Sequence, residues 1–292
     1  MSEVFLTKSP LEERLYTLSV DDFAFLKAQT RIEDENMMKQ HIIAIQRKAY
    51  EIYGYPCIRS FAFAKSKISH LPAYPIALEL CHKRPGALFL DIGCCFGSDV
   101  RKIVADGWPV QNTIASDLRQ GFWDLGHELF KSTPDTFPAL FIAGDAFDSQ
   151  FIAPREPFIE TPHAQPSLGP LTSLTPLQGH VSVIHASAFF HLFLEEDQLE
   201  LARRVASLLS PLPGSFIFGA HVGRPEKGIL GGDGPDQIQA TFCHSPESWR
   251  GLWDGQVFKN GTVTVDVELV RRERPDLAGP PIFMLIWSVT RV

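Results

Sequence analysis

Residues 88–99 read LFLDIGCCFGSD, and this stretch decides the fold. An apolar run ends at Asp91 and is followed by a turn bounded by Gly93 and Gly97. Glycine suits a loop whose backbone turns sharply or approaches a ligand, and Ser98 is of a residue type that caps helices. An amphipathic run follows it. The stretch therefore predicts a strand, a ligand-binding loop and a helix, as in folds that bind a nucleoside cofactor.

The residues of this loop indicate which nucleoside cofactor it binds. A dinucleotide fingerprint, G-x-G-x-x-G, needs a middle glycine where this loop has Cys95, and a carboxylate at Asp91 would repel a phosphate. S-adenosylmethionine has no phosphate, and a carboxylate attracts its sulfonium and ammonium groups. We therefore expect S-adenosylmethionine as the cofactor, with a nicotinamide-dependent oxidoreductase as a rival. The predicted contacts in this stretch are Asp91, Gly93, Cys94 and Gly97.

Composition limits the kinds of protein and partner. With 292 residues, 45% of them hydrophobic, the chain can bury the core of one large domain with an added cap. The net charge is -7 and no basic run occurs, so we expect no nucleic-acid partner. Five cysteines without a C-x-x-C pair favour a reducing compartment. No stretch approaches the roughly 20 apolar residues of a membrane span, so we expect a cytoplasmic monomer or homodimer without a membrane partner.

The first part of the chain, 1–85, is predicted to be a helical cap with a substrate-lining segment. Apolar residues recur at steps of four and three within 11–53, which is typical of an amphipathic helical region. The segment 53–75 is rich in aromatic residues and interrupted by three prolines, so we expect it to wrap over a pocket. The residues of the predicted apolar stripe are Met38, Ile42, Ile45, Ala49 and Ile52.

The core, 86–292, alternates short apolar segments with amphipathic ones, which indicates a parallel sheet covered on both faces. Two final segments, 262–270 and 281–292, are predicted to pair antiparallel across a short loop with Pro275 and Gly279. The predicted class is α/β, with a Rossmann-like, mostly parallel sheet of seven strands and one antiparallel strand near its edge. The other expected strands are 87–91, 112–116, 139–143, 181–185 and 215–219, and the expected helices are 98–106, 119–131 and 196–209.

Two insertions interrupt this pattern. The segment 149–179 is too rich in proline for a helix and too long for a plain connection, so we expect a partly mobile insertion. The segment 223–239 combines glycines with charges. It is interpreted either as a lid over the site or as a passive surface loop.

Acidic residues follow the second and third predicted strands, as Asp91 ends the first. Asp117 is placed to accept from both ribose hydroxyls, although a helix cap is the alternative. Asp145 is placed to accept from the adenine amino group, although an Asx turn would also explain it. Because an open parallel sheet binds ligands at the carboxyl ends of its strands, three acids in this register are more specific than one. The neighbouring residues expected to contact the cofactor are Leu118, Ala146, Phe147 and, after the fourth strand, Ala186.

Three histidines are candidates for catalysis: His185, His191 and His221. Methyl transfer from a sulfonium mainly requires alignment in a dry site. A carboxylate acceptor needs no base, whereas a phenol or alcohol would need one of these histidines. Each could instead be a hydrogen-bonded structural residue. Without an E-x-x-H or C-x-x-C partner, we expect no metal site.

Several motifs together resemble the fungal methyltransferases of meroterpenoid and related secondary-metabolite pathways, over roughly residues 50–220. The motifs are YPCIRSF, FLDIGCCFGSDVRKIVADGWP, ASDL, FHLF and LLSPLPGSFIFG. The resemblance implies a class I methyltransferase sheet, S-adenosylmethionine-dependent O-methylation, and cofactor contacts at Asp117 with Leu118 and at Asp145 with Ala146. Some family members methylate the carboxylate of a farnesylated polyketide acid.

The predicted function is therefore O-methylation of a small apolar secondary metabolite, first of all at a carboxyl group of a terpenoid or polyketide-type acid. Two alternatives stay open. One is methylation of a hydroxyl group with a histidine base, and the other is a relative that binds S-adenosylmethionine without methylating. Glutamines that family members often have are replaced here by Ser98 and by Ala220 with His221, so the acceptor side is expected to differ.

Overall fold

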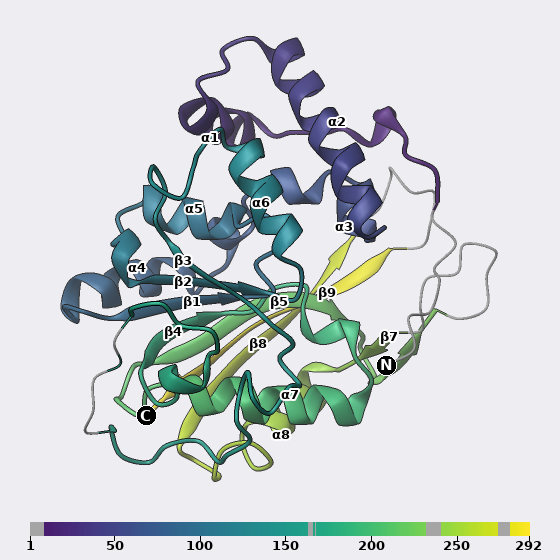
Figure 1. Cartoon of the computed structure of the whole chain (residues 1–292). Helices are drawn as coiled ribbons and strands as arrows, with labels where there is room; N and C mark the ends of the chain where they lie inside the picture. Colours follow the sequence, from purple (N-terminus) through teal and green to yellow (C-terminus); the bar gives the residue numbers. More distant parts are fainter. Residues whose placement is uncertain (1–8, 163–165, 167, 232–240, 274–280) are drawn as a thin grey trace.

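Seven strands form one sheet, and only one of them runs against the others (Figure 1). The computed structural model describes residues 9–162, 166, 168–231, 241–273 and 281–292. The strand order is β3-β2-β1-β4-β5-β9-β8, and β9 lies antiparallel to both of its neighbours. The strands are β1 (Leu88–Ile92), β2 (Thr113–Asp117), β3 (Leu140–Ala143), β4 (Val181–His185), β5 (Phe216–Gly223), β8 (Val263–Arg272) and β9 (Ile282–Arg291).

This sheet confirms the predicted fold class, including the antiparallel strand near the edge. Four of the five predicted parallel strands agree with the structure to within one residue at each end, but β5 continues to Gly223. It does so because β9 pairs with it along its whole length, a contact that no local pattern reveals. The loop with Pro275 and Gly279 lies outside the described residues.

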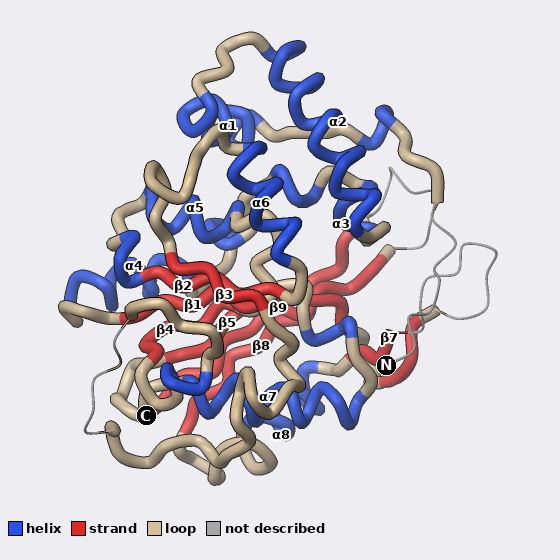
Figure 2. Tube along the Cα trace, viewed as in Figure 1, coloured by secondary structure: helices blue, strands red, loops and turns tan. Residues whose placement is uncertain are grey.

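Helices cover both faces of the sheet (Figure 2). Alternate strand residues point to opposite faces, so Phe89 and Phe218 pack with α4 and α5, while Leu90 and Ile217 pack with α7 and α8. The helices are α1 (Val20–Thr30), α2 (Glu35–Ile52), α3 (Pro56–Arg59), α4 (Tyr74–Lys83), α5 (Ser98–Ala105), α6 (Gln120–Leu129), α7 (Glu195–Leu208) and α8 (Pro246–Trp253). Within the described ranges, no helix has the length and apolar character needed to cross a membrane.

The N-terminal helices pack on α6 and on the turn after β1. Ile42 and Ile45 share one buried cluster with Phe96, Phe122 and other apolar residues. The predicted helical region is divided in two. α1 ends at Thr30 because the cap residue Arg31 has a left-handed backbone (φ 62°), and α2 starts after its own cap, Asp34. The predicted stripe is buried except for Ile52. After α2, α3 and short 3-10 turns replace any long helix, as predicted.

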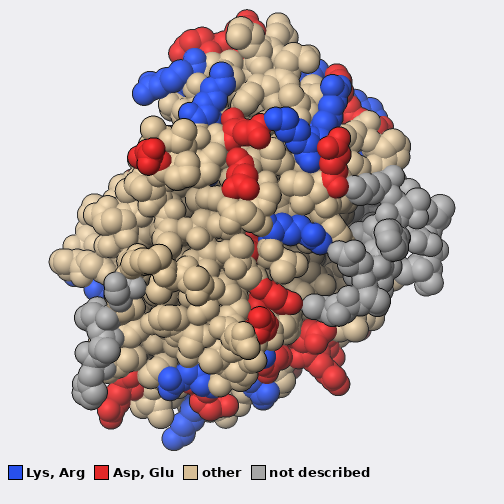
Figure 3. Space-filling view, viewed as in Figure 1, with Lys and Arg blue, Asp and Glu red and all other residues tan. Residues whose placement is uncertain are grey.

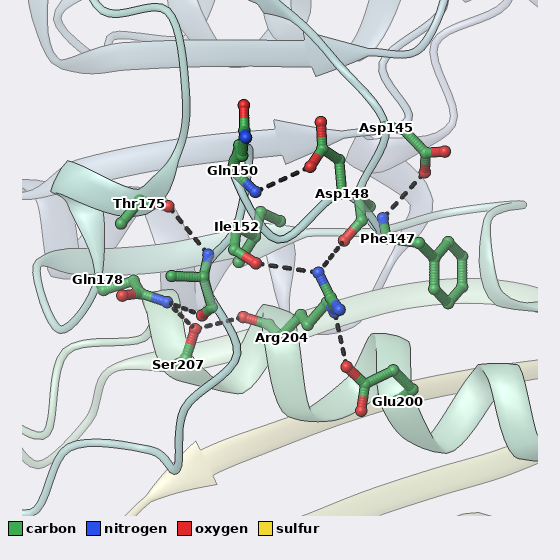
Figure 4. A network of polar contacts seen from close by, with 12 residues as sticks. Asp145, Phe147, Asp148, Gln150, Ile152, Thr175, Gln178, Glu200, Arg204 and Ser207 are labelled. Carbon is green, nitrogen blue, oxygen red and sulfur yellow. Dashed lines mark hydrogen bonds and ion pairs between the residues drawn. The ribbon is translucent and has the colours of Figure 1, made fainter.

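The first insertion is docked on α7 (Figure 4). Arg204 of α7 donates from Nη1 to the carbonyl oxygen of Ile152 at 3.0 Å, and its Nε donates to Glu200 at 2.7 Å. Gln178 donates to the carbonyl oxygen of Ala153 at 2.7 Å and to Ser207 at 2.9 Å. Both ends of the segment 149–179 are therefore part of the core. Its residues 163–165 and 167 lie outside the described ranges.

The second insertion begins with a small hairpin. β6 (Gly228–Leu230) pairs antiparallel with β7 (Thr241–Cys243). Residues 232–239 of the predicted lid lie outside the described ranges. On the face drawn in Figure 3, basic and acidic side chains are interspersed.

We predict that Gly126→Ala destabilises the protein by about 2–4 kcal/mol, because it overpacks a close contact. A methyl group at Gly126 would lie 2.3 Å from the carbonyl oxygen of Phe96, so α6 would have to move away from the loop after β1. The control is Gly251→Ala in α8, where nothing lies within 4 Å of the added methyl. That change should stabilise by about 0.5–1 kcal/mol. Urea unfolding measures both, and equal effects would contradict the contact.

Candidate active site

The loop after β1 is held in a left-handed backbone conformation. Gly93, Cys95 and Gly97 have φ values of 76°, 52° and 67°. The amides of Gly93 and Cys94 both donate to the carbonyl oxygen of Ser116, at 2.8 and 3.0 Å. Glycine adopts such φ values without strain. At Cys95 the Cβ atom makes the left-handed conformation unfavourable by about 1–2 kcal/mol. The loop is thus fixed against the end of β2.

The start of α5 is anchored to the N-terminal segment. The prediction that Ser98 caps this helix is wrong, because Gly97 is the cap residue and Ser98 is already helical. Instead, Ser98 donates from Oγ to the carbonyl oxygen of Phe63 at 2.5 Å. Asp99 accepts from the backbone amides of Lys67 and Ile68 at 2.8 and 2.9 Å. These contacts bring the segment 53–75 next to the loop.

Asp117 stands at the end of β2 and bridges the loop to α6. Its Oδ2 accepts from the amide of Cys95 at 2.8 Å, and its Oδ1 accepts from the amide of Arg119 at 3.0 Å. Burial raises the pKa of this carboxyl group, against the opposing effect of the two amides. Each oxygen keeps one lone pair for a further donor. The neighbouring Leu118 is 56% exposed, so an apolar side chain is available beside this carboxylate.

Asp145 follows β3 and forms an Asx turn, the alternative interpretation of this residue. Its Oδ1 accepts from the amide of Phe147 at 2.9 Å, as Figure 4 shows. Ala146 is buried, and its carbonyl oxygen lies 3.5 Å from Nη1 of Arg204. The half-buried ring of Phe147 lies edge-on to Phe193, with centroids 4.9 Å apart. The turn thus presents an aromatic ring at the carboxyl edge of the sheet.

A buried polar chain joins the ends of β1, β4 and β5. Nδ1 of His185 lies 2.8 Å from Oδ1 of Asp91, and its Nε2 lies 2.7 Å from Oγ of Ser187. That oxygen also accepts from the amide of Ala220 at 3.1 Å. Burial lowers the pKa of His185, but the Asp91 carboxylate outweighs it and the net shift is upward. Both ring nitrogens are engaged, and neighbouring Ala186 is fully buried.

His191 and His221 lie near each other, with ring centroids 6.4 Å apart. His185 does not join them. The ring of His185 contacts Phe218 on the α4 and α5 face of the sheet. His221 follows Phe218 by three positions in β5, so its side chain points to the opposite face. There His221 packs against Trp249 at 4.6 Å between centroids. The structure therefore separates the three predicted candidates into one single histidine and one pair.

A third histidine, His244, extends this pair and was missed by sequence reasoning. It directly follows β7, and its ring centroid lies 5.2 Å from that of Trp249. Burial lowers the pKa of His191 and of His244 to about 4 and that of His221 well below its usual value. The three rings are thus neutral at pH 7.

Arg101 is a second residue that no motif indicated. It is buried in α5 and donates from Nη1 to the carbonyl oxygen of Phe96 at 3.1 Å, so it supports the loop from beneath. Its guanidinium lies over the rings of Phe130 and Phe137, at 4.6 and 4.5 Å from their centroids. Burial among these rings lowers the Arg101 pKa to about 9. The helical pattern gives no clear signal for it, because Arg101 falls at the edge of the apolar face formed by Val100, Ile103 and Val104.

The two loop cysteines are poor nucleophiles. Burial raises the pKa of both Cys94 and Cys95 well above the usual value, and the Asp117 carboxylate acts in the same direction. A thiol rather than a reactive thiolate therefore stands in the loop. In the part of the chain that the structure describes, no three histidine, cysteine or acidic side chains are arranged so that they could hold a metal ion.

Comparison with known proteins gives consistent matches. A family model described as the N-terminal domain of meroterpenoid methyltransferases matches residues 11–64. O-methyltransferase phiE of Fungal sp. (strain ATCC 74256) is 31% identical over 237 residues, 81% of this chain and 71% of that protein. The Asnovolin E/Chermesin D methyltransferase nvfJ of Aspergillus novofumigatus is 31% identical over 273 residues, 92% of this chain and 87% of that protein.

A solved structure also aligns with nearly the whole chain. It is the Burkholderia thailandensis 1,6-didemethyltoxoflavin-N1-methyltransferase with bound S-adenosylhomocysteine, at 11% identity and a TM-score of 0.46. The alignment covers 95% of this chain and 92% of that one. The curated relatives and the family model confirm the resemblance that the motifs indicated.

Proposed function

The chain belongs to the family of fungal secondary-metabolite methyltransferases and uses S-adenosylmethionine, and we propose that it methylates a carboxylate oxygen of a small apolar acid. The cofactor supplies a methyl group on a sulfonium, which a nucleophilic oxygen displaces in line. The protein must hold the two reactants aligned and keep water out. Whether it must also remove a proton depends on the acceptor.

The loop edge offers groups that fit this cofactor. Asp117 keeps free lone pairs on an oriented carboxylate, which suits two vicinal hydroxyls of a ribose. Asp91 uses Oδ1 for His185, and its other oxygen is available to an ammonium group. Exposed Leu118 and the turn of Asp145 with Phe147 suit an adenine ring. We assign the cofactor contacts to these residues.

One observation carries the proposal of a carboxylate acceptor: the histidines at the site are badly placed to act as a base. His185 has both ring nitrogens engaged. Nδ1 of His221 accepts from the indole N–H of Trp287 at 3.0 Å. His191 has a pKa of about 4, which is far below that of a base suited to a phenol or alcohol. A carboxylate is already ionised at pH 7 and needs no base.

Charge and apolar surface support the same acceptor. The positive charge of exposed Lys67 adds to burial in lowering the pKa of His191, so Lys67 contributes positive potential on the side where a carboxylate would lie. Half-buried aromatic rings lie beside the loop. A methyl group at Gly93 would meet the ring of Phe189 at 2.8 Å, and Phe189 lies 5.8 Å from Phe193. An acid on an apolar skeleton matches both features.

The product decides the acceptor class. The purified chain is incubated with S-adenosylmethionine carrying a deuterated methyl group and an extract of its source organism, and labelled products are found by mass spectrometry. A methyl ester loses its label as deuterated methanol in mild alkali, and we expect this result. A label that survives alkali, as in an ether, would contradict the proposal and favour a hydroxyl acceptor.

We predict that Asp117→Ala weakens binding of S-adenosylhomocysteine by about 1–3 kcal/mol, measured by calorimetry. The variant leaves the ribose hydroxyls and the Cys95 amide without an acceptor, which is the cost of unpaired polar groups. The control is Asp124→Ala on the exposed side of α6, whose carboxylate accepts from Gln120. Unchanged affinity in Asp117→Ala would remove the ribose assignment.

A further inference from the structure

A buried pair, Trp287 on β9 and His221 on β5, fixes the protonation of one imidazole. The indole Nε1 of Trp287 donates to Nδ1 of His221 at 3.0 Å. Indole nitrogen is only a donor, so Nδ1 must present its lone pair and the proton of the neutral ring is on Nε2. Both side chains are at most 2% exposed. Aromatic rings of Trp249 and Phe190, at 4.6 and 6.0 Å, hold the imidazole in place.

The proton on Nε2 of His221 has no acceptor among the residues that the structure describes. Buried polar groups in proteins are nearly always paired, and an unpaired donor is costly. Nδ1 of His191, the neighbouring ring, is likewise buried without a partner. Nε2 of His244 and Nε1 of Trp249, whose rings belong to the same cluster, are also buried without a partner among the described residues. Unpaired nitrogens from several elements therefore gather around His221. Each buried nitrogen that is left without a hydrogen-bond partner lowers the stability of the fold, so an atom of a bound ligand is the natural partner.

This place lies at the edge where ligands bind. The pairing of β4 with β5 ends at His185 and Phe218, and β5 continues past it to His221. Parallel sheets bind ligands at the carboxyl ends of their strands. His191 enters from the segment directly after β4. Among the described residues, the titratable side chains that shift the pKa of His221 are those of His191 and His244, and both are neutral at pH 7.

We propose that His221 donates its Nε2–H to an oxygen of the acceptor carboxylate, and that Trp287 is the positioning residue that fixes this tautomer. The inference rests on the proposed carboxyl acceptor and assigns the residue that recognises it. It gives His221 a role opposite to that of a base. A ring whose Nδ1 is held by an indole and whose Nε2 is protonated can orient a nucleophilic oxygen but cannot take a proton from it.

The geometry also determines which kinetic constant responds. The acceptor oxygen is fully charged before transfer and loses its charge as the new C–O bond forms. A hydrogen bond to it is therefore strongest before the reaction. Removing the donor should therefore raise the KM for the acceptor without lowering kcat.

The experiment compares His221→Gln, which keeps an N–H donor, with His221→Phe, which does not, using the acceptor identified by mass spectrometry. We expect His221→Phe to raise the acceptor KM about tenfold or more, with affinity for S-adenosylhomocysteine within twofold of the parent. His221→Gln should recover most of that loss. A lower melting temperature with an unchanged acceptor KM would show that a buried water, and not the acceptor, completes the donor, and would overturn the proposal.

A second measurement needs no acceptor. In protein labelled with nitrogen-15 histidine, NMR should show His221 protonated on Nε2 only and not titrating between pH 5.5 and 8.5. Trp287→Phe should release this tautomer. A proton on Nδ1 in the parent protein would refute the inference. An alkali-stable product with the KM effect intact would instead reject the carboxyl acceptor and leave the hydrogen bond standing.

Discussion

The carboxylate of Asp117 is the contact on which the rest of the site depends. It accepts from one amide in the loop after β1 and one at the start of α6, so a single side chain sets the distance between the two segments that flank the cofactor edge. The carbonyl oxygen of Ser116 accepts from two further amides of the loop, and Arg101 donates to the carbonyl oxygen of Phe96 within it. Its backbone donors and left-handed turns are therefore held in place before any ligand arrives. This rigidity suits a reaction in which alignment supplies most of the catalysis.

The two faces of the sheet have different electrostatic roles. On the α4 and α5 face, Asp91 and His185 form a buried pair in which burial raises the pKa of Asp91 and the carboxylate outweighs burial in raising the pKa of His185. On the α7 and α8 face, His191, His221 and His244 stay neutral among tryptophans because burial disfavours their charged forms. The first arrangement suits a cationic cofactor. The second suits an apolar acceptor that is recognised through hydrogen bonds.

Local patterns predicted the elements that they themselves determine. The strand ending at Asp91, the glycine loop and the acids at Asp117 and Asp145 follow from periodicity and spacing, and the strands appear where expected. Ser98 was misassigned as a cap because both it and Gly97 suit that position, and only the backbone conformation distinguishes them. The pair of Trp287 with His221 joins residues 66 positions apart through β9. No single-sequence pattern encodes such a contact, so the tautomer was beyond prediction.

The central claim is that this site transfers a methyl group to an oxygen that is already ionised, without a base. The pH dependence of kcat tests it most directly, measured with saturating acceptor and cofactor. Carboxylic acids ionise at about pH 4, and His185, His191 and His221 are not required to accept a proton. The account predicts a kcat that stays level between pH 6 and 9. A kcat that rises tenfold per pH unit through part of this range would contradict it, because a proton would then have to leave the acceptor or the enzyme before transfer.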